Sequence, residues 1–273
     1  ISRALVRTVL SCYHPAIAPA QWRFAEGERG KPYIAGPAGA PPIHFNLSNT
    51  PGLVVCAVSL AHPSLGVDAE SLARAGETVS IADHYFSAHE ARALRALPVE
   101  RQRERFFAYW TLKESYIKAR GLGLALPLEQ FTFLLDEGPD IGITFDPRLA
   151  DHPERWRFAL HQTASGHLIA VGADTAGAPL SLRAADYVPL RGVTAPAGRP
   201  GSRPLSPGGT ASSDSSAGWR TSAPASESTS AWALLPPPPS SPPRTRPVIA
   251  SWWRPAVATA NGTTTWPTGR FRC

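Results

Sequence analysis

The stretch ERQRERFFAYWTLKESYIKARGLG, residues 100–123, is where the sequence indicates regular structure most clearly. We expect one helix over residues 100–120, because Gly121 and Gly123 follow the last turn and glycine commonly ends a helix. The elements on either side of this helix decide the fold class.

Shorter elements flank the long helix. Helical spacing of apolar residues predicts helices over residues 2–13 and 79–97, each followed by proline. Apolar or β-branched runs bounded by turn residues predict strands over 43–47, 53–60, 65–70, 130–135, 141–145, 157–162 and 167–172. Strands, then helices, then strands predict an α+β fold rather than a parallel doubly wound sheet.

The chain changes character after Gly177. Residues 1–177 hold 17 Lys and Arg against 18 Asp and Glu, and residues 178–273 hold 10 against 3, so the net charge of +6 is −1 plus +7. The second segment is rich in proline and serine and has no periodicity, so we expect a disordered tail. Because the basic excess falls outside the part expected to fold, nucleic-acid binding is not indicated.

The cysteines and the apolar segments indicate in which cellular compartment the protein is expected. Cys12, Cys56 and Cys273 are far apart and show neither disulfide nor metal-site spacing, which fits a reduced cytoplasmic protein. The apolar runs fall short of the roughly 18 residues of a membrane span, and no signal pattern is present at the N-terminus. The chain begins with Ile1 and contains no methionine, which indicates that its natural start is missing.

Two carboxylates lie close together in the segment GVDAE, residues 66–70. Asp68 and Glu70 are two residues apart on a predicted strand, so both side chains project from the same face. Like charges side by side repel unless a cation compensates them, and Mg²⁺ with its oxygen shell is a common solution. The alternative interpretation is a solvated strand face.

The long helix carries a second set of charged residues. Trp110, Glu114 and Lys118 follow at i, i+4 and i+8 and share one face, while Lys113 lies beside it. The alternative is a surface ion pair between Glu114 and Lys118, worth roughly a few tenths of a kcal/mol. Only three of the 27 basic residues are lysines, the third being Lys31. A lysine retained among so many arginines favours sites that need a compact ammonium group.

Taken together, these segments resemble a known family. GVDAE at 66–70 and WTLKESYIKARGLGLALPL at 110–128 are similar to the paired signature of Sfp-type 4'-phosphopantetheinyl transferases, a G-[IV]-D-x-E strand before a W-x-x-K-E-x-x-x-K helix. Gly30-Lys31-Pro32 and FNLSN at 45–49 resemble the family's GKP and F-N-[ILV]-S-H elements, in the same order. The resemblance covers about residues 2–175.

The sequence departs from the family pattern at two places. Asn49 stands where the family commonly has histidine, so a phosphate contact there would come from a neutral amide. The family also has a further segment before the first helix, with basic groups that contact coenzyme A. We therefore expect a chain that is truncated at its N-terminus.

The resemblance implies an architecture of two similar α+β halves related by a pseudo-twofold axis, with coenzyme A in the cleft between them. The halves would be residues 1–63 and 64–177, the second carrying the metal site, and residues 178–273 would form the tail. The protein would be a monomer.

The resemblance also implies an activity and its residues. The 4'-phosphopantetheine arm of coenzyme A would move to a serine of an apo carrier protein, of acyl-, peptidyl- or aminoadipate-reductase type, with release of 3',5'-ADP. Mg²⁺ would be held by Asp68, Glu70 and Glu114, and Glu114 would accept the serine proton. Lys113 and Lys118 would contact the pyrophosphate or the leaving group. The nucleotide end would be bound by Arg29, Lys31, Ser48 and Asn49.

Two alternatives belong to other functional classes. One is a non-catalytic homologue that binds coenzyme A or a carrier protein without turnover. The other is a different Mg²⁺-dependent enzyme that hydrolyses a pyrophosphate without a protein acceptor.

Overall fold

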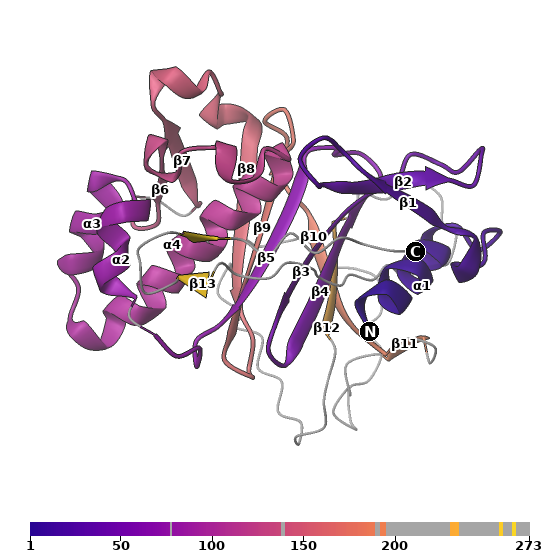
Figure 1. The fold of residues 1–273 in the computed structure, drawn as a ribbon, viewed down its shortest axis with the longest axis horizontal. Helices are drawn as coiled ribbons and strands as arrows, with labels where there is room; N and C mark the ends of the chain where they lie inside the picture. The colour runs from indigo at the N-terminus through magenta and orange to yellow at the C-terminus, as the bar shows by residue number, and fades with distance from the viewer. Residues whose placement is uncertain are drawn as a thin grey trace, which may run out of the picture.

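The computed structural model describes residues 1–76, 78–137, 140–188, 192–194, 230–234, 257–258 and 264–265 (Figure 1). Its architecture is α+β, as predicted. The helices are α1 (Ser2–Tyr13), α2 (Val79–Tyr85), α3 (Ala88–Arg95) and α4 (Val99–Arg120). The strands are β1 (Arg23–Glu26), β2 (Pro32–Gly36), β3 (His44–Thr50), β4 (Leu53–Ser59), β5 (Leu65–Ser71), β6 (Phe131–Leu134), β7 (Gly142–Phe145), β8 (Trp156–Gln162), β9 (His167–Asp174), β10 (Leu182–Val188), β11 (Gly192–Thr194), β12 (Ser230–Leu234), β13 (Val257–Ala258) and β14 (Thr264–Thr265).

The strands pair with one another in antiparallel fashion. β5, β9 and β8 form a three-stranded sheet in that order, and β3 pairs with β4 beside it. Separate ladders join β1 to β2 and β6 to β7. Figure 1 shows α4 lying across β5 and β9, with α2 and α3 at one end of the molecule and α1 with the β1–β2 hairpin at the other. The long helix therefore lies against the strand that carries Asp68.

Glycine lets α4 approach the sheet closely. Gly66 on β5 is paired with Gly172 on β9. A Cβ atom at Gly66 would lie 1.9 Å from the carbonyl oxygen of Ser115 and 2.4 Å from the amide nitrogen of Ala119. A Cβ atom at Gly172 would lie 3.2 Å from Ser115 Oγ. The backbones of helix and strand meet here because neither strand has a side chain in the way.

The hydrophobic core lies in two clusters on the two sides of β5. One contains apolar side chains of α1, β3 and β4, together with Leu65, Val67 and Ala69. The other surrounds α4 and is rich in aromatic rings, among them Tyr116 and Trp156. Odd-numbered residues of β5 thus fill the first cluster, and the alternation of a strand turns the even-numbered residues towards α4.

Most of the predicted elements are confirmed within one or two residues, but the helix expected over 79–97 is wrong. It is two helices, α2 and α3, because the chain is extended at Phe86 and Ser87 caps the second helix. Ser87 Oγ accepts the Glu90 amide, and the Glu90 carboxylate accepts the Ser87 amide at 2.9 Å. This capping box gives the backbone a better local partner than a continuous helix offers.

Three further strands or strand ends were not predicted. β1 and β2 form a hairpin in a segment for which no element was predicted. β3 continues through Thr50, so Ser48 and Asn49 belong to a strand instead of a turn. None of the helices in the described ranges combines the length and apolar character needed to cross a membrane.

The expectation that regular structure ends at Gly177 is also wrong for β10. This strand pairs with β11 and with β12, and Tyr187 is buried in the core cluster that also contains side chains of α1. Pairing with a distant segment and burial of one aromatic ring stabilise a strand that has no local signal. Most of residues 178–273, for which a disordered tail was predicted, lie outside the described residues. The division at residues 63 and 177 stays a prediction.

Candidate active site

Polar side chains of β3, β5 and α4 meet at one buried place. Ser48 comes from β3, Asp68 and Glu70 come from β5, and Glu114 and Lys118 come from α4. All five are buried. The predicted alternative of solvated charges on a strand face and a helix surface is therefore wrong. What is buried instead is a cluster of three carboxylates with a lysine and a serine.

The centre of this cluster is a hydrogen-bonded set of three groups. Lys118 Nζ lies 2.6 Å from Asp68 Oδ1 and donates to Ser48 Oγ at 2.9 Å. Ser48 Oγ donates to the same Asp68 oxygen at 2.5 Å. The other carboxylate oxygen, Asp68 Oδ2, is buried and has no hydrogen-bond partner in the described parts of the chain. Such an oxygen can bind a cation or accept a hydrogen bond without giving up an existing partner.

The FNLSN segment attaches β3 to β5 through its side chains. Asn46 Oδ1 accepts the amide of Val67 at 2.8 Å, and Ser48 Oγ accepts the amide of Ala69 at 3.2 Å. Asn46 and Ser48 thus take up the amide groups that flank Asp68 in the chain. The position of Asp68 is consequently tied to both strands and to α4.

If all three were ionised, Asp68, Glu70 and Glu114 would carry more negative charge than Lys118 and Arg74 neutralise. Burial, together with the neighbouring Asp68 charge, raises the pKa of Glu70 to about 7, although Arg74 and Lys118 oppose this rise. Burial and the Asp68 charge raise the pKa of Glu114 to about 8, with Lys118 opposing. Perturbed carboxyl groups of this kind are common at functional sites. A divalent cation would relieve the same repulsion.

The donor chemistry of this cluster fits Mg²⁺, but its present geometry is not a finished metal cage. Carboxylate oxygens are the ligands that Mg²⁺ prefers, and Asp68 Oδ2 is available to one. However, within the described ranges no three His, Cys, Asp or Glu residues are gathered in an arrangement that could hold a metal ion. Metal binding by Asp68, Glu70 and Glu114 stays a prediction.

Lys113 does not reach this cluster, and its predicted contact with the pyrophosphate is corrected here. Its Nζ lies 2.8 Å from Glu90 Oε2 and donates to the carbonyl oxygens of Leu128 and Phe131 at 2.8 and 2.6 Å. The side chain is 1% exposed. Lys113 is one position from Glu114, so the helix turns it by about 100° towards α3 and β6. It stabilises the packing of α3, α4 and β6.

Of the four predicted nucleotide-binding residues, Arg29 and Lys31 line a separate cavity, whereas Ser48 lies in the carboxylate cluster and Asn49 is not part of the cavity lining. This cavity, of about 470 Å³, is lined by residues of the β1–β2 hairpin, β3 and the end of α4, including Arg29 and Lys31. Lys31 Nζ donates to the carbonyl oxygens of Ala119 and Leu65 at 2.8 and 3.2 Å, and burial lowers its pKa to about 8. Asn49 follows Ser48 on β3, so its side chain leaves the opposite face of the strand. Coenzyme A binding by all four residues stays a prediction.

Some residues around the site were missed by the sequence reasoning. Arg74 Nη1 lies 2.8 Å from Glu70 Oε1, and Arg103 holds the backbone of that loop through the carbonyl oxygens of Leu72 and Arg74. The spacing of four residues between Glu70 and Arg74 was the available signal. This signal is weak because Glu70 lies on a strand and Arg74 in the following loop, where a spacing of four residues has no fixed meaning.

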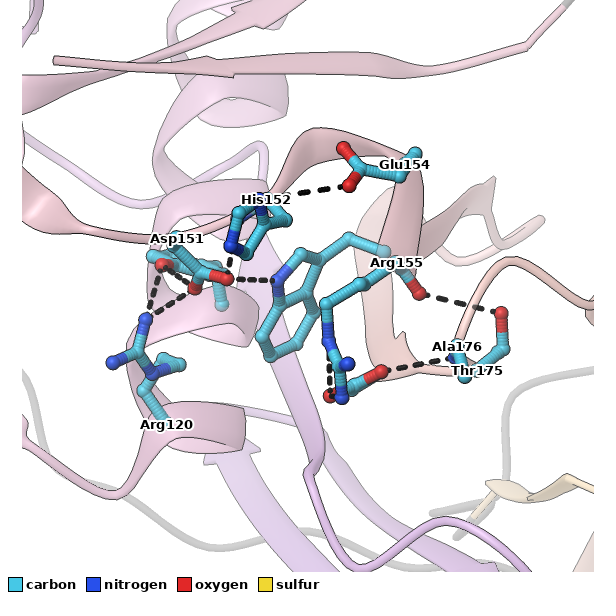
Figure 2. A network of polar contacts seen from close by, with 10 residues as sticks. Arg120, Asp151, His152, Glu154, Arg155, Thr175 and Ala176 are labelled. Carbon is cyan, nitrogen blue, oxygen red and sulfur yellow. Dashed lines mark hydrogen bonds and ion pairs between the residues drawn. The ribbon is translucent and has the colours of Figure 1, made fainter. Parts of the chain in front are cut away.

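Asp151 organises the end of α4 (Figure 2). Its carboxylate accepts the Tyr116 hydroxyl at 2.6 Å and the Trp156 indole N–H at 3.1 Å, and it pairs with Arg120. Burial and the Asp151 hydrogen bond raise the pKa of Tyr116 well above its usual value. No local pattern indicates this network, because its members come from α4, a loop and β8.

Comparison with known proteins identifies related chains. The sequence profile of the 4'-phosphopantetheinyl transferase superfamily matches residues 64–172. The chain is 37% identical over 123 residues to 4'-phosphopantetheinyl transferase HetI of Nostoc sp., with 45% of this chain and 51% of that protein covered. It is 34% identical over 139 residues to 4'-phosphopantetheinyl transferase Sfp of Bacillus subtilis, covering 51% and 58%. The chain thus spans a little over half the length of these two relatives.

A longer match is found with another Bacillus subtilis protein, 4'-phosphopantetheinyl transferase ffp. The identity is 30% over 186 residues, which cover 68% of this chain and 78% of that protein. The superfamily match contains Asp68, Glu70, Glu114 and Lys118, the four charged residues of the buried cluster. By these similarities, the chain belongs to the 4'-phosphopantetheinyl transferase family.

Proposed function

We propose that this protein transfers the 4'-phosphopantetheine group of coenzyme A to a serine of an apo acyl-, peptidyl- or aminoadipate-reductase-type carrier protein. The observation that carries the proposal is the buried cluster of Ser48, Asp68, Glu70, Glu114 and Lys118 within the segment that matches the family. Phosphoryl-type transfer depends on positioning and on neutralising charge, and carboxylates with an ammonium group can supply both.

The proposed reaction exchanges a phosphoanhydride bond of coenzyme A for a phosphoester bond to the carrier serine. The serine oxygen attacks the phosphorus that bears the pantetheine arm, and the bond from that phosphorus to the bridging pyrophosphate oxygen breaks. The serine proton passes to a base, and 3',5'-ADP leaves with the bond electrons. Asp68, Glu70 and Glu114 would hold Mg²⁺, which when bound supplies positive charge to the phosphate oxygens.

Glu114 is the residue proposed to accept the serine proton. Its pKa of about 8 is raised by burial and by Asp68, and a base acts best when its pKa is near the working pH. No hydrogen bond from another described residue occupies its carboxylate, whereas Asp68 and Glu70 each have a cationic partner. Glu114 can therefore take up a proton without first breaking an ion pair.

Lys118 is proposed to contact the pyrophosphate. In this structure it is held by Asp68 and Ser48, so its ammonium group is already placed beside the carboxylates. Ser48 donates its hydroxyl proton to Asp68, so we assign it first to positioning these two residues. The cavity lined by Arg29 and Lys31 is proposed to take the nucleotide end, and Asn49 is proposed to contact the same end of the ligand from β3.

The setting of the activity is proposed on the same basis. Cys12 and Cys56 are free thiols in the described part of the chain, which supports a reducing, cytoplasmic compartment. We propose that the protein acts there as a monomer.

The test is intact-mass spectrometry of purified apo carrier proteins of the three types, each incubated with the protein, coenzyme A and Mg²⁺. We expect at least one carrier to gain the mass of a single phosphopantetheine group and 3',5'-ADP to appear in equal amount. Nucleotide release without a carrier would indicate a pyrophosphate hydrolase. Binding of coenzyme A with no modification of any carrier would indicate a non-catalytic homologue.

A further inference from the structure

Arg120, at the last turn of α4, is held firmly from one side. Its Nη1 donates to the Tyr116 hydroxyl at 2.9 Å and forms an ion pair with the Asp151 carboxylate (Figure 2). Asp151 is itself fixed by Trp156 Nε1 and by the amide of His152. An arginine fixed by a carboxylate in this way has lost most of its rotamer freedom before any ligand arrives.

The rest of this guanidinium group is available. Among the described residues, Tyr116 and Asp151 are the hydrogen-bond partners of Arg120, and both use Nη1. The N–H groups of Nε and Nη2 therefore remain available to donate hydrogen bonds to another acceptor. The side chain is 27% exposed. A planar fork with free N–H groups suits a phosphate, which can accept two of them at once.

Arg120 belongs to the lining of the cavity of about 470 Å³. Arg29, Lys31 and His44 line the same cavity, and Glu28 is its acidic residue. Burial lowers the pKa of His44 and so disfavours its charged form, and Asp151 balances the charge of Arg120. Arg29 and Lys31 still outnumber Glu28 in the lining, and this positive excess favours an anionic ligand. The cavity thus combines positive charge with an arginine that is already oriented.

The pyrophosphate assigned to Lys118 cannot be this anion. Two residues along a helix correspond to a rotation of about 200°, so Arg120 leaves α4 on a different side from Lys118. Along β5, Leu65 lies three residues from Asp68, a distance of roughly 10 Å, and the Leu65 carbonyl contacts the Lys31 ammonium at the cavity. The cavity is therefore suited to a second anionic group on the same ligand, at some distance from the carboxylate cluster.

We propose that Arg120, positioned by Asp151 and Tyr116, is a specificity residue that binds the phosphate monoester on the ribose of coenzyme A. This inference rests on the proposed function, because it takes coenzyme A as the ligand. Arg120 selects the ligand that carries this phosphate over the same molecule without it. Asp151 and Tyr116 are positioning residues, since they act through Arg120.

The test compares two ligands that differ only in this group, coenzyme A and dephospho-coenzyme A. Their dissociation constants are measured by isothermal titration calorimetry with the full chain, Mg²⁺ present, for the wild type and for Arg120→Gln. We expect Arg120→Gln to weaken coenzyme A binding by about tenfold, as for loss of one charge-assisted contact, and to change dephospho-coenzyme A binding less than twofold.

Two further variants separate specificity from structure. Arg120→Lys keeps the charge but loses the fork, and Asp151→Asn keeps the shape but loosens Arg120, so both should reduce the preference for coenzyme A by a smaller factor. Arg148→Gln is the matched control, because Arg148 is exposed, pairs with Asp146 and is outside the cavity. Its preference should equal that of the wild type. Thermal midpoints by circular dichroism show which variants remain folded.

The possible outcomes distinguish failure of this inference from failure of the proposed function. An equal loss for both ligands in folded Arg120→Gln, or an unchanged preference in Arg120→Gln and Arg120→Lys, overturns the inference and leaves the proposed function standing. If the wild type binds neither ligand, the proposed function itself fails and the inference fails with it. If Arg120→Gln does not fold, the preference of Arg120→Lys and Asp151→Asn decides.

Discussion

Replacing Gly66 with alanine should disrupt the contact on which the site depends. The new Cβ would lie 1.9 Å from the Ser115 carbonyl oxygen and 2.4 Å from the Ala119 amide nitrogen. Real Cβ atoms essentially never approach other heavy atoms within 3.0 Å, so α4 and β5 would have to separate by an ångström or more. Both clashing groups are backbone, and no side-chain rotation can relieve them.

The magnitude follows from two opposing effects. Alanine in a strand gains roughly 0.5–1 kcal/mol over glycine through the unfolded chain, whereas overpacking costs roughly 1–3 kcal/mol and more when the backbone must move. We expect the clash to dominate and Gly66→Ala to lower the free energy of unfolding by about 3 kcal/mol. The separation would also pull Lys118 away from Asp68 and Ser48.

The assay is urea unfolding followed by circular dichroism, with Gly27→Ala as the stability control. A Cβ at Gly27 would meet its nearest neighbour, the Lys31 carbonyl oxygen, at an ordinary 3.6 Å. We expect that variant to unfold within about 1 kcal/mol of the wild type. A Gly66→Ala protein as stable as the control would refute the close packing of α4 on β5.

Further substitutions test individual groups. Glu114→Gln should lower the transfer rate roughly a hundredfold, measured by carrier mass shift, with a thermal midpoint within a few degrees of the wild type; an unchanged rate would remove Glu114 as the base. Lys113→Met should leave Glu90 buried without its cation and lower the free energy of unfolding in urea by roughly 3–5 kcal/mol, and a near-neutral result would contradict the buried ion pair of Lys113 with Glu90. The folded pKa of Lys31 is about 8, below the usual 10.5, so the unfolded chain binds more protons between these values and stability rises with pH. Relative to Lys31→Met, the wild type should therefore gain up to roughly 3 kcal/mol from pH 8 to 10.5; a constant difference would mean that burial does not lower the pKa of Lys31.

Local patterns predicted the elements that have local causes. α1 and α4 have helical spacing and a proline or glycine stop, and the one strand that holds Asp68 and Glu70 has an apolar run. The two carboxylates of β5 and the charged face of α4 could be placed on their elements for this reason. The hydrogen-bonded set of Ser48, Asp68 and Lys118 was not predicted, because the family resemblance assigned Ser48 to the nucleotide end and these residues are up to 70 residues apart.

The sequence-based predictions are wrong where contacts between residues far apart in the chain determine the structure. Lys113 and Lys118 are both lysines of one helix, and only the partner on α3, Glu90, shows that Lys113 faces away from the site. β10 is a strand because other segments pair with it and Tyr187 is buried, neither of which its composition indicates. Arg120 and Asp151 are likewise brought together by tertiary structure, so their network has no signature in the sequence.

The most direct test of the central claim is to locate the modification on a carrier protein and to compare Asp68→Asn with the wild type. The carrier is incubated with coenzyme A and Mg²⁺, and tandem mass spectrometry identifies the modified residue. The account predicts phosphopantetheine on one serine with the wild type and with the surface control Arg148→Gln, and at least a hundredfold slower modification with Asp68→Asn, whose folding is verified by circular dichroism. Modification by folded Asp68→Asn at the wild-type rate would contradict the assignment of the buried cluster as the catalytic site.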